Sequence, residues 1–308
     1  MMNSFTIVLY QLIQFFVMLV CGYGVARRRI VSKAFLDGLA SLMMKLLIPV
    51  LIFSNAMDGT TWRMVVSSAE ILWLTAALYG SLIIVMAALA KILRLRGNHS
   101  RIVQATLIFG NAGFIGIPLL LAAFPGHGGI YVTLMSMIDQ FFLWTYGIYL
   151  TTPREKALAL SWKNFINPAL VAVVSAIVCI AIGITLPKPV EGALLTIGHA
   201  ATPLALLYLG GLLYFSHWQV AAKSVKLYIG MAVKLLLFPL AFYAAASRLC
   251  DDLAAVRAMT LIAALPTMTV IAMFAEKHDN ESDFTLGTVL IMTVLSLVTL
   301  TIVSYLIF

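Results

Sequence analysis

The sequence predicts an all-α membrane protein in which ten transmembrane helices form two inverted five-helix repeats, with helices four and nine broken near the midplane. Three observations predict it: the composition, the alternation of basic loops, and the matched positions of prolines. The chain of 308 residues is 62% hydrophobic and only 10% charged, whereas soluble domains carry about 25% charged residues. Apolar runs of about 20 residues, the length of a membrane-spanning helix, recur along the whole chain.

Apolar runs and the polar breaks between them give the order of the expected helices. The spans are 4–26, 34–57, 68–90, 102–123, 128–150, 165–186, 193–216, 225–247, 254–275 and 284–307. In the first span the basic residues 27–29 follow the apolar run instead of preceding it, so this span is expected to be a transmembrane helix and not a cleaved signal peptide.

The distribution of Lys and Arg predicts the orientation of the helices. Of the 20 basic residues, 14 lie in loops that follow odd-numbered helices and 4 in loops that follow even-numbered ones. Because cytoplasmic loops carry the excess of Lys and Arg, the odd-numbered loops are expected in the cytoplasm and both termini outside. The net charge of +8 is therefore mainly a topology signal, and no nucleic-acid partner is expected.

Matched prolines indicate an internal repeat. Pro49 and Pro203 lie 154 residues apart, and Pro118 and Pro266 lie 148 residues apart, which is close to half the chain in both cases. A half with five helices forces the next half to insert upside down, as in many secondary transporters. We therefore expect a first repeat at 1–155 and a second, inverted repeat at 156–308.

Two stretches within helices four and nine contain helix breakers: FGNAGFIGIP at 109–118 and ALPTMT at 264–269. A proline leaves the carbonyl four residues earlier without its helical donor, so the carbonyls of Phe114 and Ile262 are expected to be free. A helix that restarts after a break offers unpaired N–H groups and a positive dipole end. Irregular backbone at membrane depth occurs only inside protein or beside a watery cavity. Two such breaks facing each other predict a pocket for an anionic group.

The residues expected to form this pocket combine an amide with breakers and small residues. The substrate-binding candidates are Asn111, Gly113, Gly116, Pro118, Pro266 and Thr267. The Asn111 amide can both donate and accept hydrogen bonds. A small-residue face that seats a neighbouring helix would also explain the glycines, but not the asparagine or the proline. Thr267 and Thr269 could bond substrate, although such hydroxyls more often bond the backbone of their own helix.

Three of the ionisable residues inside the expected helices are candidates for function. Asp139 lies roughly 16 Å into helix five, Lys45 lies at similar depth in helix two, and Lys234 is shallower. Intramembrane charges are costly and are candidates for function. Three interpretations stay open: a lysine attracts a substrate carboxylate, Asp139 binds a coupling proton or cation, or Asp139 forms a buried structural ion pair with one of the lysines.

Other chemistry lacks support in the sequence. Cys21, Cys179 and Cys250 have no metal-ligand spacing, so neither a metal site nor a cofactor is expected. The five histidines are scattered and no hydrolase or metalloprotease motif occurs, so the chain is not expected to be an enzyme.

The stretch GNAGFIGIPL resembles the N-x-G-x-x-G-x-P signature of the auxin efflux carrier family, and ALPTMTVIAMFAEKHD resembles the matching segment of its second half. The resemblance covers essentially the whole chain. It implies a substrate held where helices four and nine cross, in contact with Asn111. It also implies an elevator motion, in which helices 1, 2, 6 and 7 form a scaffold, expected to be a homodimer, and helices 3–5 and 8–10 form the transport unit.

The same family includes plant PIN-type auxin carriers and bacterial carriers proposed to move malonate and other carboxylates. Only residues 151–164 separate the two halves here, whereas many plant members have a long cytoplasmic loop. The resemblance therefore favours a bacterial inner-membrane protein. The expected function is secondary transport of small organic anions, foremost carboxylates, across the lipid bilayer, with a proton or sodium as the coupling ion to consider. The alternatives are a sodium-coupled symporter of the bile-acid type and an anion channel.

Overall fold

The computed structural model describes residues 4–125, 127–157 and 168–308. Lys163 and the start of the expected sixth span lie outside these residues. Every regular element in the described part is helical. The α-helices of the first half are α1 (Ser4–Arg27), α2 (Lys33–Leu42), α3 (Ile48–Met57), α4 (Trp62–Ser67), α5 (Glu70–Ile92), α6 (Gly97–Ile108), α7 (Ile117–Ala123), α8 (Gly128–Phe142), α9 (Ile148–Thr151) and α10 (Arg154–Ala157). Those of the second half are α11 (Pro168–Ala181), α12 (Lys188–His199), α13 (Ala201–Phe215), α14 (Gln219–Ala222), α15 (Val225–Ala232), α16 (Phe238–Ala246), α17 (Leu253–Ala263), α18 (Thr269–Lys277) and α19 (Ser282–Ile307).

Length and composition qualify five continuous helices of the described part as membrane-spanning. They are 33–57, 70–92, 188–215, 225–246 and 282–307. Three shorter apolar helices, 13–27, 168–181 and 253–263, complete the set. Many large apolar side chains on these helices are exposed, as on a surface that faces lipid; Ile84, for example, is 70% exposed. The chain is thus an integral membrane protein by composition.

Short π-helical segments connect several α-helices within one rod. They are η1 (Met43–Leu47), η2 (Ala112–Gly116), η3 (Leu143–Gly147) and η5 (Val233–Leu237). Three of them end two residues before a proline, namely Pro49, Pro118 and Pro239. Because proline has no N–H, a shift to bonds five residues apart lets the helix pass it, as when the N–H of Ile48 donates to the carbonyl of Met43.

Pro118 therefore does not itself interrupt helix four, although the interruption falls within the predicted stretch 109–118. Pro118 is the second residue of α7, directly after η2, where a missing N–H costs nothing. The α-helical run stops earlier, at Ile108, and residues 109–111 are non-helical. In helix nine the non-helical residues are 264–268, as the sequence leads one to expect around Pro266, but the carbonyl of Ile262 accepts from the amide of Leu265 at 3.2 Å and is not free.

Glycines set the closest helix contact in the molecule. A Cβ atom on Gly22 of α1 would lie 2.2 Å from the carbonyl oxygen of Leu207, and one on Gly210 of α13 would lie 2.0 Å from that of Leu19. The backbones of α1 and α13 therefore touch directly. In lipid, such contact through small residues is a main source of helix association because apolar side chains gain little by leaving apolar lipid.

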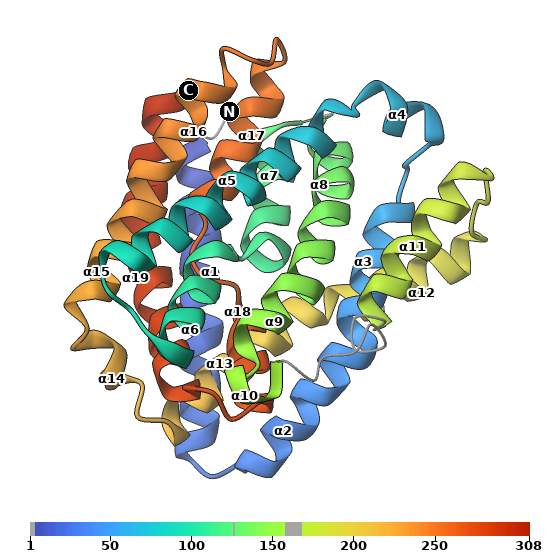
Figure 1. Cartoon of the computed structure of the whole chain (residues 1–308). Coiled ribbons are helices and arrows are strands. Elements are labelled where there is room, and N and C mark those ends of the chain that lie inside the picture. The colour runs from blue at the N-terminus through green and yellow to red at the C-terminus, as the bar shows by residue number, and fades with distance from the viewer. Residues whose placement is uncertain (1–3, 126, 158–167) are drawn as a thin grey trace.

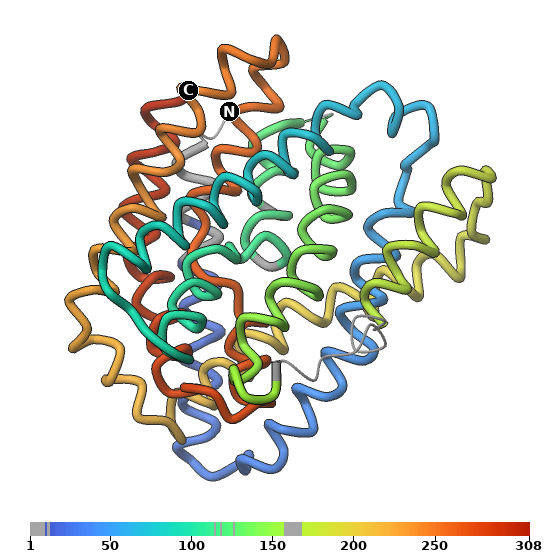
Figure 2. Tube along the Cα trace, in the orientation of Figure 1, coloured from blue at the N-terminus to red at the C-terminus, as the bar shows by residue number. Residues whose placement is uncertain are grey.

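The helices pack in two groups. In one, α1 packs on α13, and α3 packs on both α11 and α12; Figure 1 shows α3, α11 and α12 together on one side. In the other, α5 contacts α6, α8 and α17, and α19 contacts α16 and α18. Figure 2 shows the end of α19 at one end of the molecule, with α2, α10 and α14 at the opposite end.

Candidate functional site

The interrupted segments of the two halves pair with each other. The amide of Asn111 donates to the carbonyl of Pro266 at 2.7 Å, and the amide of Met268 donates to the carbonyl of Phe109 at 2.8 Å. Gly110 and Thr267 form the antiparallel bridge between these bonds. Each break thus supplies partners for the backbone groups that the other break has lost, which is what a buried non-helical segment requires.

Side chains satisfy the carbonyls at the ends of α6 and α17. The Thr267 hydroxyl, which is fully buried, donates to the carbonyl of Thr106 in α6 at 2.7 Å. The Lys234 ammonium, only 1% exposed, donates to the carbonyl of Ala263 at 2.6 Å, the last residue of α17. A cation at a helix C-terminus is stabilised by the dipole. The Thr267 hydroxyl therefore links the second break to the first half of the chain. Lys234 caps the end of α17, where the second break begins.

Asn111 lies at the start of the segment that follows the first break. Its backbone carbonyl accepts from the amides of Ile115 and Gly116, both at 3.0 Å, and so begins η2. Its side chain is 2% exposed, and Nδ2 donates to the hydroxyl of Thr269 at 3.5 Å. Asn111 and Thr269 line a cavity of about 10 Å³ that faces α1, α13 and α19, where Thr293 adds a further hydroxyl.

The glycines of the motif have different surroundings. A Cβ on Gly116 would lie 2.8 Å from Ile262 and 2.9 Å from Leu265, which are side chains of the second half. A Cβ on Gly113 would meet nothing within 4 Å, because Gly113 lines a cavity. Gly116 is thus a close-packing position, as in the small-residue alternative, whereas Gly113 borders open space. The side chain of Pro118 lies outside the part of the chain that the structure describes.

A second cavity, with other lining residues, borders the crossover and has a volume of about 40 Å³, room for one or two water molecules. Its walls come from the crossover, from α8, and from the scaffold candidates α3 and α11. Its lining includes Gly113, Met268, Asn55, Ser136, Asp139 and Val173. It is therefore the place where the two interrupted helices, both helix groups and an ionisable side chain meet.

Asp139 is 1% exposed and has neutral partners. The Tyr79 hydroxyl of α5 donates to Oδ1, and the Gln140 amide donates to Oδ2 at 2.9 Å. The indole N–H of Trp144 in turn donates to Gln140 Oε1 at 3.0 Å. Sequence reasoning missed Tyr79, Gln140 and Trp144. Tyr79 lies 60 residues from Asp139 along the chain, and the sequence contains no signal that the two side chains meet.

Neither lysine pairs with Asp139. The ion pairs among the described residues join Lys33 to Glu276, His99 to Glu281 and His217 to Asp283. Lys45 lies exposed on η1 and Lys234 bonds Ala263. The ion-pair interpretation therefore has no support in this structure, and Lys45 does not line the cavity at the crossover.

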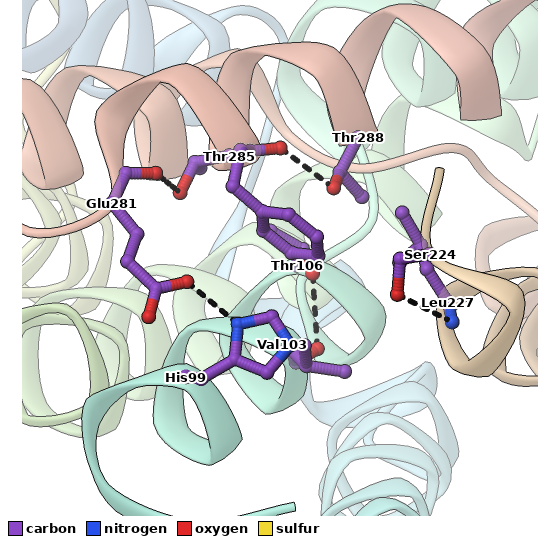
Figure 3. A network of polar contacts seen from close by, with 9 residues as sticks. His99, Val103, Thr106, Ser224, Leu227, Glu281, Thr285 and Thr288 are labelled. Carbon is purple, nitrogen blue, oxygen red and sulfur yellow. Dashed lines mark hydrogen bonds and ion pairs between the residues drawn. The ribbon is translucent and has the colours of Figure 1, made fainter. Parts of the chain in front are cut away.

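A further polar network joins the start of α6 to the start of α19. Figure 3 shows the His99 ring directed at the carboxylate of Glu281, with Nδ1 and Oε2 2.7 Å apart. The hydroxyl of Thr285 donates to the carbonyl of Glu281 at 2.9 Å. The His99 ring also contacts Phe284 edge-on at 4.8 Å. These contacts tie the start of interrupted helix four to the start of α19.

Comparison with known proteins identifies a family of membrane transporters. The family described as membrane transport protein matches residues 7–304, nearly the whole chain. No curated protein matches the chain.

Proposed function

From the premise that the chain belongs to the membrane transport protein family, the auxin efflux carrier family of the two sequence motifs, we propose that it is a secondary carrier of small organic anions, foremost carboxylates. The transported anion binds where the two interrupted helices cross. Transport families of this kind move solutes without chemical conversion, in keeping with the expectation that the chain is not an enzyme.

The observation that carries the proposal is the paired crossover of 109–111 with 266–268 beside a cavity. Both η2 and α18 begin at this crossover, so two helix starts lie there. N–H groups at a helix start favour anions. Asn111 and Thr269 add an amide and a hydroxyl in one cavity, and Gly113 leaves space in the other. Pro266 contributes its carbonyl to the pairing, and Thr267 holds the end of α6.

The two helix groups support an elevator-type alternating-access mechanism. In this proposal α1, α2, α3 and α11–α13 form the scaffold, and the other helices form the transport unit, with inverted repeats at 1–155 and 156–308. The cavity has one wall from each group: Asn55 and Val173 belong to the scaffold, and Gly113 and Asp139 to the transport unit. A volume of about 40 Å³ is too small for a dicarboxylate, so the scaffold wall must move away to admit one.

The proposal includes a bacterial inner-membrane location with both termini outside, and a homodimer formed through the scaffold. The location rests on the excess of basic residues in alternate loops. Loops that follow odd-numbered spans would then face the cytoplasm, at the end that carries α10 and α14.

A liposome experiment tests the function. Purified protein is first screened for thermal stabilisation by monocarboxylates and dicarboxylates with and without sodium, and the stabilising compounds are then measured as radiolabelled substrates in counterflow. We expect saturable uptake that unlabelled carboxylates compete. Conductance at ion-channel rates would favour the channel, and flux that vanishes when choline replaces sodium would favour the bile-acid type of symporter.

The variant Asn111→Ala tests the site. We expect it to insert and fold but to lose counterflow, because the crossover loses its amide. Asn98→Ala is the matched control, since Asn98 lies in the first turn of α6, about three turns before the crossover, and its Oδ1 accepts from the amide of Arg154 at 2.8 Å. Unchanged counterflow in Asn111→Ala would remove Asn111 from the site.

A further inference from the structure

Asp139 is the ionisable residue that lines the cavity at the crossover. Its carboxyl group is 1% exposed, Tyr79 is 1% exposed and Gln140 is 5% exposed. Both of its hydrogen-bonding partners are neutral donors, one to each oxygen. Two neutral donors stabilise a carboxylate less than a cation would, and a buried carboxylate without a cation is costly. The group is thus held where the charged and the proton-bound forms can both exist.

The elements packed against α8 bring no cation to Asp139. The titratable groups on these elements are Arg63 of α4, Glu70, Tyr79 and Lys91 of α5, Tyr146 of η3 and Cys179 of α11; α3, η2 and α7 have none. Glu70 and Lys91 stand at the two ends of α5, about 13 and 18 Å along the helix from Tyr79. Tyr131, on α8 itself, bonds Asp252 at 3.1 Å. Of all these groups, Tyr79 contacts Asp139.

An anion in this cavity would therefore stand beside a carboxylate with no nearby cation. Like charges a few ångströms apart in a poorly solvated site repel strongly. A proton on Asp139 removes this repulsion. Sodium is a poorer candidate because Asp139 is the one anionic side chain in the described lining of the cavity, and both of its oxygens already accept hydrogen bonds.

We propose that Asp139 binds a coupling proton together with the transported anion, so that one proton crosses with each anion. This inference rests on the proposed function and deepens it. The proton leaves water on one side and forms an O–H bond with the Asp139 carboxylate, and that bond breaks when the proton returns to water on the other side. No bond of the anion changes.

The aromatic contacts around Asp139 connect this proton site to both breaks. The Tyr79 ring lies 5.9 Å from that of Phe109, whose carbonyl accepts from Met268. The Trp144 ring lies 5.0 Å edge-on from that of Phe274 in α18. Proton binding that rearranges the Tyr79 and Gln140 bonds thus acts on groups that touch each interrupted helix. All of these residues belong to the proposed transport unit, so proton and anion would move as one body.

Infrared spectroscopy of the purified protein in lipid tests the proton site without any substrate. We expect the difference spectrum between acid and alkaline buffer to contain the carbonyl stretch of a protonated, buried carboxylic acid. Asp139→Asn should lose this band entirely. Asp58→Asn, which changes an exposed carboxylate at the end of α3, should keep it. Tyr79→Phe removes a donor to the ionised form and should move the midpoint of the band to higher pH.

Three results would overturn the proposal: no titrating band in the unchanged protein, a band that persists in Asp139→Asn, or a band that sodium chloride abolishes while choline chloride does not. The last would make the site a sodium site. Flux in liposomes supplies the second readout, with radiolabelled malonate as probe and a proton gradient as driving force. Asp139→Asn should lose the stimulation of malonate flux by the gradient, whereas Asp58→Asn should keep it. If no carboxylate moves in the unchanged protein, the proposed function fails, and the infrared result still decides the proton site.

Discussion

The amide of Asn111 donates to the carbonyl of Pro266 across 2.7 Å, although the two residues lie in opposite halves of the chain. With the bond from Met268 to Phe109, it forms a two-bond strand pair inside an otherwise helical protein. Because unpaired peptide groups are costly in hydrocarbon, neither break is stable without the other. The two halves of the chain therefore depend on each other at the crossover. Removing a side-chain hydrogen bond that stabilises the crossover should lower the free energy of unfolding.

We predict that Thr267→Val lowers the stability of the protein by about 1–3 kcal/mol, because it leaves the carbonyl of Thr106 without its buried donor. Thermal unfolding in detergent measures the effect. Thr293→Val is the matched control: its hydroxyl donates at 2.7 Å to the carbonyl of Val289, four residues earlier in its own helix, a bond that adds little. Equal losses of stability in the two variants would show that the hydrogen bond across the crossover stabilises the protein no more than one within a single helix.

A second prediction compares two glycines of α1. Gly22→Ala should destabilise the protein by roughly 1–3 kcal/mol, since the added methyl group would collide with the backbone of Leu207 and force α1 from α13. Gly24→Ala, in the same helix, meets nothing within 4 Å and should leave stability unchanged or raise it slightly. The apparent unfolding temperatures of the two variants measure the effect. A Gly22→Ala variant as stable as the unchanged protein would contradict the close backbone contact between α1 and α13.

The ion pair between Lys33 and Glu276 spans the two helix groups, from α2 to α18, at 3.1 Å. Lys33→Glu should place two carboxylates side by side and change the exchange rate, and the double change Lys33→Glu with Glu276→Lys should restore it. The Lys33 side chain is 57% exposed, so the coupling should be about 1 kcal/mol at most. A double-mutant cycle on exchange rates measures it. Independent, additive effects would show that the pair does not link the groups during transport.

Part of this architecture follows from sequence, and part cannot. Apolar runs and basic loops predict where helices lie, and the motif at 109–118 predicts an unusual backbone, because both signals are local. The exact site of the first interruption was not predictable from Pro118, since a π-helical turn absorbs that proline while the pairing with 266–268 stops the α-helix at Ile108. That pairing depends on a segment in the other half of the chain.

The charged residues illustrate the same limit. Their depth in the apolar runs singles out Asp139, Lys45 and Lys234 as unusual, but depth does not reveal a partner. Lys234 reaches the end of α17, Asp139 reaches Tyr79, and Lys45 points away from the cavity. Which face of a helix meets protein or lipid is settled by tertiary packing, and a single sequence contains no measure of it.

Cys250, in the loop after α16, allows a test of both topology and local chemistry. Cys250 is 7% exposed, and burial, followed by the hydrogen bond from its thiol to Glu70 at 3.2 Å, raises the pKa of the thiol to about 11. Because the thiolate is the reactive form, a maleimide should label Cys250 slowly at neutral pH and faster as the pH rises toward 11. Glu70→Gln removes a negative charge beside the thiol and should speed labelling at a given pH.

Maleimide labelling also tests the orientation of the helices in the membrane, because the loop between α16 and α17 is expected outside the cell. A membrane-impermeant maleimide added to intact cells should label the unchanged protein but not Cys250→Ser, in which Cys21 and Cys179 remain as internal references.

The last prediction concerns Lys234, for which the substrate-attracting and the structural interpretations now give different outcomes. Its ammonium donates to the carbonyl of Ala263, and that bond satisfies the end of α17 beside the crossover. Lys234→Gln keeps an N–H donor without the charge, whereas Lys234→Met keeps the length and loses both. If the residue holds the helix end, Lys234→Gln should fold and transport with a modest loss, and Lys234→Met should unfold at lower temperature, with a cost of about 1–3 kcal/mol for the unpaired carbonyl. If the charge instead attracts the anion, both variants should lose substrate affinity equally while keeping their stability. Apparent unfolding temperatures and substrate affinities measured on both variants separate these outcomes, and the contact with Ala263 leads us to expect the first.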